Sequence, residues 1–598
     1  MAPSSSSQRA AGRLLTSSRR RFVRRARPWV LWSVLGLIVL GGLWLAVTAV
    51  LARHELTAAR QQITTLRKQI LDGDLAGAQR TSRSVERHAR KAHQLTTGPA
   101  WALTAAVPGV GAPAHTVRGL TDAVDQLGSG ALPELVDVSR GLDPHALLTG
   151  GGTVDLSAIQ KAAPAIHRAN IATAHAQSDV AGMSGSWLGP VSSARTSLLS
   201  ELNRLTTTLS AGDRAARVLP PMLGAQRPQR YFVGLLNTAE ARGVGGLPGA
   251  FVILVADHGK LHIEHYGSDT ELIKVRANVS LGAEYQANYG QADPQGNYVN
   301  STISPNFPYA AQIWAGMWQR KSGEKIDGAV SLDPTALSYL LKVTGPGKTA
   351  AGQVVSAQNV VALTEKVAYS RYPDNTVRKK FLLDVARAAD ARILGTKSNG
   401  TALVKAAGKA AGERRLLVWS ADPSVEADLS SLPVAGTIPA TPTTFAGLVV
   451  NNAAGSKLDY YLHRTMRWQA TGCGDRRSVT VTITLTNAAP ANLPPYATTR
   501  ADKPSYPVKP GDNRLLVSYY ASTGAELGGV TLDGKGVKGT ATTELGHPVY
   551  TVDVELPRGA TRTMVVTLTE PTGGSPIVLN QPLVVPMQVD VVKPSSCH

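Results

Sequence analysis

The spacing of hydrophobic positions changes along the chain, and each change predicts a different kind of element. Residues 29–52 form an uncharged apolar run, WVLWSVLGLIVLGGLWLAVTAVLA. A run of this length can cross a bilayer as a helix of about 20 residues. The a and d spacing of a long helix continues directly after it, at Leu56, Ala59, Ile63, Leu66 and Ile70. We therefore predict a transmembrane helix over 29–52 and a helical stalk over 53–212.

Short apolar runs predict buried strands in the middle of the chain. The runs at 231–236 and 250–255 are rich in aromatic and β-branched residues and are bounded by Gly, Pro and Asn. Helix and strand patterns then alternate through 307–318, 326–333 and 334–343. Such alternation is typical of a mixed or parallel sheet with helices on both faces. We predict an α/β domain over 213–450.

The last part of the chain has the pattern of an all-β domain. Val479 to Thr486 alternates strictly between apolar and polar residues, and Asp533-Gly534 is a hairpin signal between further short strands. We predict a β-sandwich over 451–598. The expected fold is thus a multidomain α/β plus β protein with an N-terminal transmembrane helix and stalk.

The charge of the N-terminal tail predicts the orientation in the membrane. Residues 1–28 contain eight arginines and no acidic residue. The positive-inside rule places such a basic tail in the cytoplasm, so we expect a single N-in span with the bulk of the chain outside. The segment Ser18 to Arg24 resembles a twin-arginine export signal, although the apolar span suits the general secretion route equally well.

The remaining charge favours anionic partners outside the membrane. The formal net charge is +20, and eight of these charges belong to the tail. A basic exported protein meets anionic lipids, phosphorylated glycans and lipid-linked polymers. No basic helix with interleaved aromatic residues indicates nucleic-acid binding, and we expect none.

The chain has two cysteines, Cys473 and Cys597, which flank most of the predicted β-sandwich. An exported domain can form a disulfide. On the chain-entropy account, this disulfide would stabilise the fold by about 4 to 5 kcal/mol. Two unpaired thiols are the alternative.

The segment between the first two predicted strands is the first candidate site. It runs from Asn237 to Gly249 and includes Glu240, Arg242 and several glycines. Buried loops leave backbone donors without partners, so we expect this segment at an opening, where it would bind a ligand. A solvated hairpin connection is the alternative.

An arginine cluster at a predicted helix start is the second candidate site. Arg371, Asp374 and Arg378 lie close together there. Guanidinium groups and a helix N-terminus suit phosphate or pyrophosphate. The same residues could instead form a solvated salt-bridge surface.

Several motifs, in this order along the chain, resemble the bacterial domain-of-unknown-function family 4012. They are the segments 230–246, 327–334 and 344–346, the single residue Asn359, and the segments 369–379, 417–420 and 451–461. They span most of the exported chain. The family has no assigned activity, so the resemblance implies a domain type and no mechanism.

The order of elements also resembles the LytR-CpsA-Psr phosphotransferases. These enzymes are anchored by one N-terminal helix and transfer glycopolymers from polyprenyl-pyrophosphate carriers to peptidoglycan outside the membrane. The resemblance implies catalytic roles for Arg242, Asp374 and Arg378, and substrate binding by Glu240, Asp269 and Arg371. It also implies Mg2+, with Asp374 as a ligand.

These observations lead to two alternative functions. The first is an extracytoplasmic envelope protein that binds or transfers lipid-pyrophosphate-linked glycopolymers in cell-wall or exopolysaccharide assembly. The second is a non-catalytic cell-envelope scaffold or adhesin, in which the arginines form a salt-bridged surface.

Overall fold

The computed structural model describes residues 19–71, 74–109, 111–141, 148–396, 400–440, 442–472 and 474–592. It has a long apolar N-terminal helix, mixed α/β structure and several β-sheets, as predicted. The chain divides into two compact units. The first comprises Met1–Gly141 and Ala162–Asp213, and the second comprises Leu142–Lys161 and Arg214–His598. Cys473 and Cys597 lie outside the described residues, and so does the predicted disulfide.

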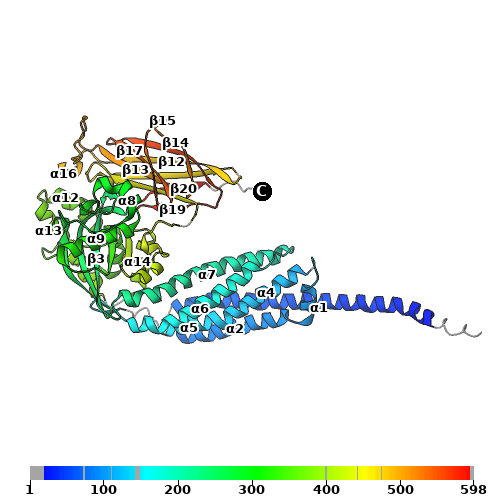
Figure 1. Cartoon of the computed structure of the whole chain (residues 1–598). Helices are drawn as coiled ribbons and strands as arrows, with labels where there is room; N and C mark the ends of the chain where they lie inside the picture. The colour runs from blue at the N-terminus through cyan, green and yellow to red at the C-terminus, as the bar shows by residue number, and fades with distance from the viewer. Residues whose placement is uncertain are drawn as a thin grey trace, which may run out of the picture. The chain divides into compact units, whose positions relative to one another are not determined.

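The first unit is helical (Figure 1). Its longest element is α1 (Arg19–Leu71), which continues without a break from the apolar run into the stalk. The other helices, the last two of which extend into the second unit, are α2 (Leu75–Thr96), α3 (Pro99–Ala105), α4 (Ala112–Gln126), the π-helical turn η1 (Leu127–Ala131), α5 (Leu132–Gly141), α6 (Leu156–Gly182) and α7 (Gly189–Met222).

Small residues allow the helices of this unit to pack closely. Ala59 of α1 and Ala78 and Ala89 of α2 are buried. Leu120 of α4, Val180 of α6 and Leu202 of α7 belong to one apolar cluster. The α2 helix begins at a capping aspartate, because the Asp74 carboxylate accepts a 2.8 Å hydrogen bond from the backbone N–H of Gly77. The spacing of apolar residues thus produces a bundle around the C-terminal part of α1.

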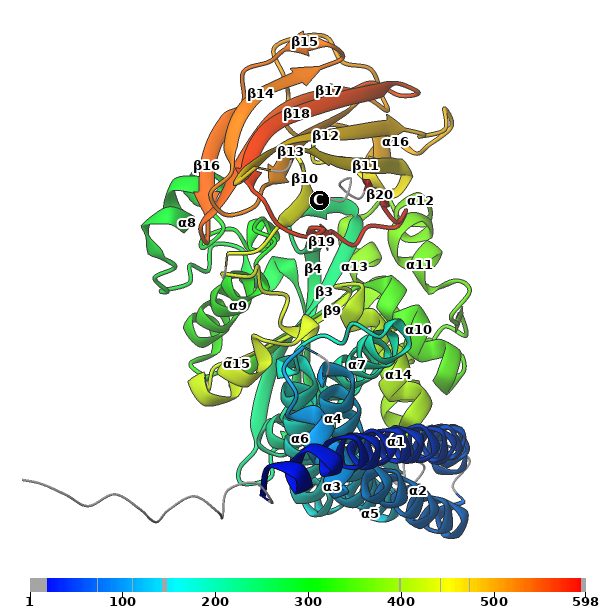
Figure 2. The ribbon, with the colours of Figure 1, turned by 90° about the vertical axis from the view of Figure 1, so that its right-hand side faces the viewer.

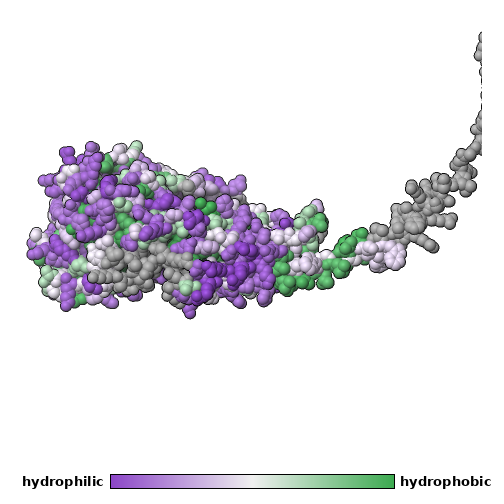
Figure 3. Space-filling model, turned by 90° about the horizontal axis from the view of Figure 1, so that it is seen from below, coloured by the Kyte–Doolittle hydropathy of each residue, from purple (hydrophilic) through white to green (hydrophobic). Residues whose placement is uncertain are grey.

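The N-terminal part of α1 leaves its apolar side chains uncovered. Trp32, Leu37 and Ile38 are each at least 64% exposed. Figure 3 shows hydrophobic surface on this projecting segment. The helix between Trp32 and Leu66 is long and apolar enough to cross a membrane. So much exposed apolar surface is unfavourable in water, and it is compatible with the predicted membrane anchor.

The second unit contains a seven-stranded sheet in the order β1-β2-β5-β4-β3-β6-β9. The strands are β1 (Leu148–Gly150), β2 (Thr153–Val154), β3 (Gln229–Arg242), β4 (Gly245–Asp257), β5 (Lys260–Ser268), β6 (Gly328–Leu332) and β9 (Leu416–Ser420). The β3 and β6 strands are parallel, and the other neighbours are antiparallel. The predicted mixed sheet is therefore confirmed.

Helices cover the seven-stranded sheet on both faces. Figure 2 shows α9 (Phe307–Ser322) and α10 (Pro334–Thr344) on opposite sides of β3. On the α9 side, Phe232, Phe251 and Trp314 form the centre of an apolar cluster. The main helical elements that follow α10 are α11 (Val360–Ala362), the π-helical turn η5 (Leu363–Val367), α12 (Ala368–Arg371), α13 (Asn375–Gly395), α14 (Gly400–Gly412) and α15 (Pro423–Leu429).

Two further sheets follow in the same unit. The five-stranded sheet has the order β16-β17-β13-β10-β19, and the six-stranded sheet has the order β15-β14-β18-β12-β11-β20. Their strands are β10 (Phe445–Asn452), β11 (Leu462–Thr471), β12 (Arg476–Asn487), β13 (Asn513–Tyr520), β14 (Glu526–Leu532), β15 (Lys535–Gly536), β16 (Thr540–Glu544), β17 (His547–Leu556), β18 (Thr561–Pro571), β19 (Ile577–Asn580) and β20 (Gln588–Val592).

One hydrophobic core joins these two sheets. Val517 and Val552 from the five-stranded sheet share it with Trp468, Ile483 and Val566 from the six-stranded sheet. Alternate residues of β12 are buried, which agrees with the alternating sequence pattern. Each sheet therefore buries one face against the other.

Candidate functional site

The first predicted site is a buried hairpin, so the prediction of an open loop was wrong. The β3 and β4 strands continue to Arg242 and Gly245, and only Gly243 and Val244 lie between them. Asn237, Glu240 and Arg242 are buried. The polar residues of this segment therefore belong to the interior of the second unit.

The backbone of this hairpin is satisfied by side chains from distant segments. The register between β3 and β4 shifts between Asn237 and Ala241, which frees the intervening residues from the ladder. The Thr238 N–H and hydroxyl each donate to Glu365 Oε1 at 2.7 Å. The Ala241 N–H donates to Asp459 Oδ2 at 2.7 Å. These carboxylates take the place that water would hold at an open loop.

Arg242 belongs to a buried cluster of three charged residues. Its guanidinium donates to Glu240 Oε1 at 3.1 Å and to the carbonyl of Asn452 at 3.2 Å. Lys457 Nζ donates to the other oxygen of Glu240. Burial alone would raise the pKa of Glu240, but the two cations outweigh it and lower this pKa. Arg242 is thus held by a fixed carboxylate.

Arg378 is also engaged by protein groups. Its guanidinium donates to the carbonyls of Tyr372 and Pro373 at 2.8 and 3.0 Å, and to Asn375 Oδ1 at 2.7 Å. It lies 4.0 Å from the ring centroid of Tyr496. These contacts are typical of a buried arginine that stabilises a helix start and an aromatic contact.

The predicted site residues form separate groups. Asp269 pairs with Lys379, and the guanidinium of the exposed Arg371 contacts Gln353 Oε1 at 3.5 Å. The ring of Tyr369 lies near both arginine groups: Lys457 Nζ, which pairs with Glu240, and the guanidinium carbon of Arg378 each lie 5.3 Å from its centroid. The structure therefore brings Glu240 and Arg242 together, whereas the hydrogen bonds of Arg378 go to residues 372–375.

Asp374 is the N-cap of α13. Its carboxylate accepts a 2.9 Å hydrogen bond from the Val377 N–H. Within the described ranges, no group of three or more His, Cys, Asp or Glu residues is arranged to hold a metal ion. The magnesium site at Asp374 stays a prediction, and the observed contact is a helix cap.

The cap predicts the effect of replacing Asp374. Asp374→Ala should lower the free energy of unfolding by about 1 kcal/mol, because the first turn of α13 loses an acceptor. Asp374→Ser, which can still accept this bond, should lose much less. Urea unfolding of the two variants measures the difference. Equal stability of both variants, with ligand binding lost in both, would instead indicate a direct role in a site.

A cavity and a neighbouring hollow lie beside Lys457 and Tyr369. Together their linings include four tyrosines. The cavity has a volume of about 220 Å³ and is lined by Glu365, Lys366, Tyr369, Ser370, Lys457, Tyr460, Tyr461, Pro490, Asn492, Leu493, Pro494 and Ala497. A hollow of about 620 Å³ shares Tyr369, Ser370 and Pro494 with it and adds Tyr496 and Arg500. We call the two together the tyrosine cavity. The larger hollow lies in the size range of small-molecule sites, and the smaller cavity lies below it.

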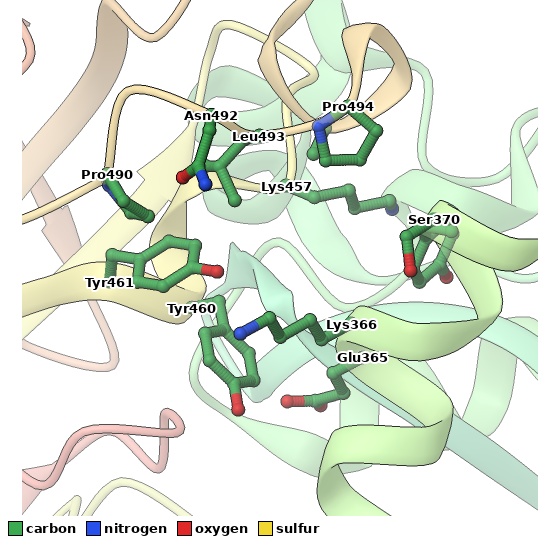
Figure 4. Close-up of a pocket in the computed structure, with 12 residues that line it drawn as sticks. Glu365, Lys366, Ser370, Lys457, Tyr460, Tyr461, Pro490, Asn492, Leu493 and Pro494 are labelled. Carbon is green, nitrogen blue, oxygen red and sulfur yellow. The ribbon is translucent and has the colours of Figure 1, made fainter.

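Three sequence-distant segments build the tyrosine cavity (Figure 4). Glu365 and Lys366 lie on the π-helical turn η5, and Tyr369 lies on α12. The 3₁₀ turn η7 (Leu458–Tyr461) supplies Tyr460 and Tyr461. The third segment is the connection that follows β12 and includes the short helix α16 (Pro495–Thr498). Single π-helical turns are frequent at functional sites.

Glu365 gives the cavity an acid with an unused oxygen. Its Oε1 accepts both bonds from Thr238, whereas its Oε2 has no hydrogen-bond partner among the described residues. Burial raises the pKa of Glu365 to about 7, although the bonds from Thr238 oppose this shift. At neutral pH this carboxyl can therefore donate or accept a hydrogen bond.

Lys366 and Tyr461 add further polar groups. The Lys366 side chain extends toward Tyr460 in Figure 4 and is exposed. Within the described ranges, the hydroxyl of Tyr461 also lacks a hydrogen-bond partner. Aromatic faces beside a few unpaired polar groups are typical of a ligand site. Glu365, Lys366 and the tyrosines of the cavity were not predicted as site residues. The adjacent pair Tyr460-Tyr461 was the available signal.

Residues 226–369 match the family model described as "Protein of unknown function (DUF4012)". The predicted resemblance to this family is confirmed over that segment, and the resemblance to the LytR-CpsA-Psr enzymes is not. A search of curated proteins finds no match.

Two solved structures align with part of the chain. The transcriptional regulator yvhJ from Bacillus subtilis aligns at 11% identity and a TM-score of 0.19, over 37% of this chain and 84% of its own. The Lin1025 protein from Listeria innocua aligns at 10% identity and a TM-score of 0.19, over 37% of this chain and 85% of its own.

Proposed function

We propose that this protein is a membrane-anchored, extracytoplasmic protein of the bacterial cell envelope that binds a glycopolymer in the tyrosine cavity without transferring it. The observation that carries the proposal is the composition of this cavity. Tyr460, Tyr461 and Tyr496 present aromatic rings to it, and Lys366 presents an exposed amine.

A glycan matches these groups chemically. A sugar ring has apolar C–H faces, which suit aromatic rings, and hydroxyl edges, which suit polar side chains such as Asn492 and Glu365. The ammonium group of Lys366 suits a phosphate or another anionic substituent as a point charge. We therefore propose a polyprenyl-pyrophosphate-linked glycan or the glycan of peptidoglycan as the ligand.

The N-terminal segment supports a place at the outer surface of the cell membrane. The apolar part of α1 is long enough to span a bilayer. The eight arginines before it favour a cytoplasmic N-terminus, which would leave the chain after the span outside.

The two C-terminal sheets support the role of a binding module. We interpret them as a β-sandwich that supplies one wall of the cavity. Tyr460 and Tyr461 lie directly before β11, and Pro490 to Pro494 follow β12. Binding groups on the connections of a rigid scaffold are common in proteins.

Transfer has less support than binding. Catalysis of phosphoryl transfer needs cationic donors directed at the developing charge. The guanidinium groups of Arg242 and Arg378 donate to protein acceptors. Lys366 remains as the exposed cation in the lining of the 220 Å³ cavity. This arrangement favours the non-catalytic alternative.

The proposal predicts that two cavity variants weaken glycan binding. We expect Lys366→Ala and Tyr460→Ala each to raise the Kd about tenfold, which corresponds to about 1.4 kcal/mol. The measurement is isothermal titration calorimetry on the full chain in lipid nanodiscs. The ligands are a polyprenyl-pyrophosphate-linked glycan and soluble peptidoglycan fragments. Lys342→Ala, which removes an exposed lysine from α10, is the matched control and should bind as the unaltered protein does.

Two outcomes would contradict the proposal. Failure of both glycans to bind, or binding that is insensitive to both variants, would favour a scaffold or adhesin that acts elsewhere. Release of polyprenyl phosphate during the titration would indicate transfer.

A further inference from the structure

Two long connections of the first unit carry no charged residue. The segment from Thr96 to Ala114 connects α2 to α4 and includes α3, and the segment from Val180 to Ala194 connects α6 to α7. By contrast, residues 72–74, which connect α1 to α2, include two aspartates. Connections on a protein surface are usually polar, so two uncharged ones in the same bundle call for a physical explanation.

Both uncharged connections lie at the end of the bundle from which α1 projects (Figure 1). The indole N–H of Trp101 donates to the hydroxyl of Thr48 on α1 at 2.9 Å, which places α3 against the apolar run. The hydroxyl of Thr116 donates to the carbonyl of Ser184 at 3.4 Å, which joins the second connection to the start of α4.

Large apolar side chains point outward from these connections. Leu103 is 73% exposed, Val107 is 48% exposed, and Trp187 is 63% exposed. Leu188 is also exposed. We call these four residues the apolar collar. Grouped exposed side chains of this kind mark an interaction surface.

The length of α1 places the collar at the level of the bilayer surface. The uncharged run begins at Trp29, and from Trp32 onward Thr48 is the first buried residue of α1. The helix rises about 28 Å between Trp29 and Thr48, at about 1.5 Å per residue. The hydrocarbon core of a bilayer is about 30 Å thick. If this run spans the core, no aqueous gap remains between the core and the end of the bundle.

We infer that the apolar collar inserts into the interfacial layer of the membrane and seats the helical bundle on the bilayer. Tryptophan favours this layer because its ring has an apolar body and a polar N–H. Leucine and valine gain by leaving water, and the absence of charge removes the cost of moving ionised groups toward lipid. The inference rests on the membrane anchoring in the proposed function, and it is independent of glycan binding.

Spin labels on the full chain test this contact. Leu103→Cys and Trp187→Cys are labelled in a background with Cys473→Ser and Cys597→Ser. Each protein is reconstituted into vesicles of phosphatidylethanolamine and phosphatidylglycerol. Ile171→Cys on α6 is the matched control, because Ile171 is an exposed apolar residue of the same bundle away from the collar. Collisions with oxygen and with a water-soluble nickel chelate are then compared by power saturation.

We expect both collar labels to collide with oxygen and to lose most of the chelate collisions that the Ile171 label shows. Vesicle flotation is measured in the same samples. If the protein floats with the vesicles but the collar labels collide with the chelate as often as the control label does, insertion of the collar is contradicted. Membrane anchoring by α1 is then unaffected. Failure to float would contradict both the membrane anchor and insertion of the collar. Spin–spin broadening between the collar labels of two molecules would show that a second copy of the chain covers the collar, which would also contradict the inference.

A second measurement needs no cysteine replacement. Brominated lipids quench tryptophan at the depth of the bromine atoms. With bromines near the interface, the Trp187→Phe variant should show a smaller quenched part of its tryptophan emission than the unaltered chain does. An unchanged quenched fraction would contradict insertion of Trp187.

Discussion

Glu240→Gln is expected to lower the free energy of unfolding of the second unit by about 3 to 5 kcal/mol, the usual cost of leaving buried charges unpaired. Glu240 lies between Arg242 and Lys457, and all three side chains are buried. Glutamine has nearly the same shape but no charge, so two cations would remain in the interior without a counter-ion. Thermal and urea unfolding of the full chain, followed by near-ultraviolet circular dichroism, measure the loss.

An exposed ion pair on the same strand provides the control. Arg230 of β3 pairs with Glu264 of β5 at 3.0 Å, and both side chains are more than one-third exposed. Glu264→Gln should cost less than about 1 kcal/mol, because water already solvates both partners. Similar stability of the Glu240 and Glu264 variants would contradict the structural role of the buried cluster.

This result bears on the roles predicted for Arg242 and Glu240. A site arginine can be removed with little loss of stability, whereas removal of Arg242 leaves Glu240 with one cation in the interior. Loss of ligand binding in an Arg242 variant would therefore need a stability measurement on the same protein before it could be assigned to a site.

The second large effect is a dependence of stability on pH through Glu365. Its pKa is raised from 4.5 to about 7 in the folded chain. Between these values the folded chain holds a proton that the unfolded chain has released, so stability falls as pH rises. At about 1.4 kcal/mol per pKa unit, the full effect is about 3 kcal/mol.

Comparison with Glu365→Gln isolates this effect from other titrating groups. Glutamine keeps an oxygen for the bonds from Thr238 and cannot ionise. The stability of the variant relative to the unaltered protein should therefore increase by about 3 kcal/mol from pH 4.5 to pH 8. Urea unfolding across this range gives the difference. Two parallel pH profiles would show that Glu365 does not titrate in this window.

The elements that could be predicted are those with a strong local signal. The apolar run of α1 needed only length and the absence of charge, and β12 needed only strict alternation. The alternation of strand and helix patterns predicted a mixed or parallel sheet covered by helices, and it did not give the strand order. These signals depend on neighbouring residues, so one sequence is enough to find them.

The buried end of the β3 hairpin could not be predicted in this way. Its polar residues indicated solvent, because local sequence does not show which remote group satisfies a backbone donor. Glu365 and Asp459, which accept those bonds, are more than 120 positions away in the chain. A polar segment can therefore be buried whenever distant carboxylates replace its water.

The tyrosine cavity was missed for a related reason. Its lining comes from segments around residues 365, 460 and 494, and none of them contains a motif with known chemistry. Their meeting depends on the packing of the central sheet and the C-terminal sheets within one unit. The arginine motifs that did attract attention in the sequence proved to be paired with protein groups.

The unbroken helix α1 sets a fixed distance between the two ends of the helical bundle. From Thr48 to Leu71 the helix rises about 35 Å at about 1.5 Å per residue, and it has no kink-forming proline in this stretch. A flexible tether would let the far end of the bundle sample a wide range of heights. When the apolar run lies in a membrane, as proposed, this rod instead keeps that end at one distance from the lipid, and a partner of that end must lie at the same height.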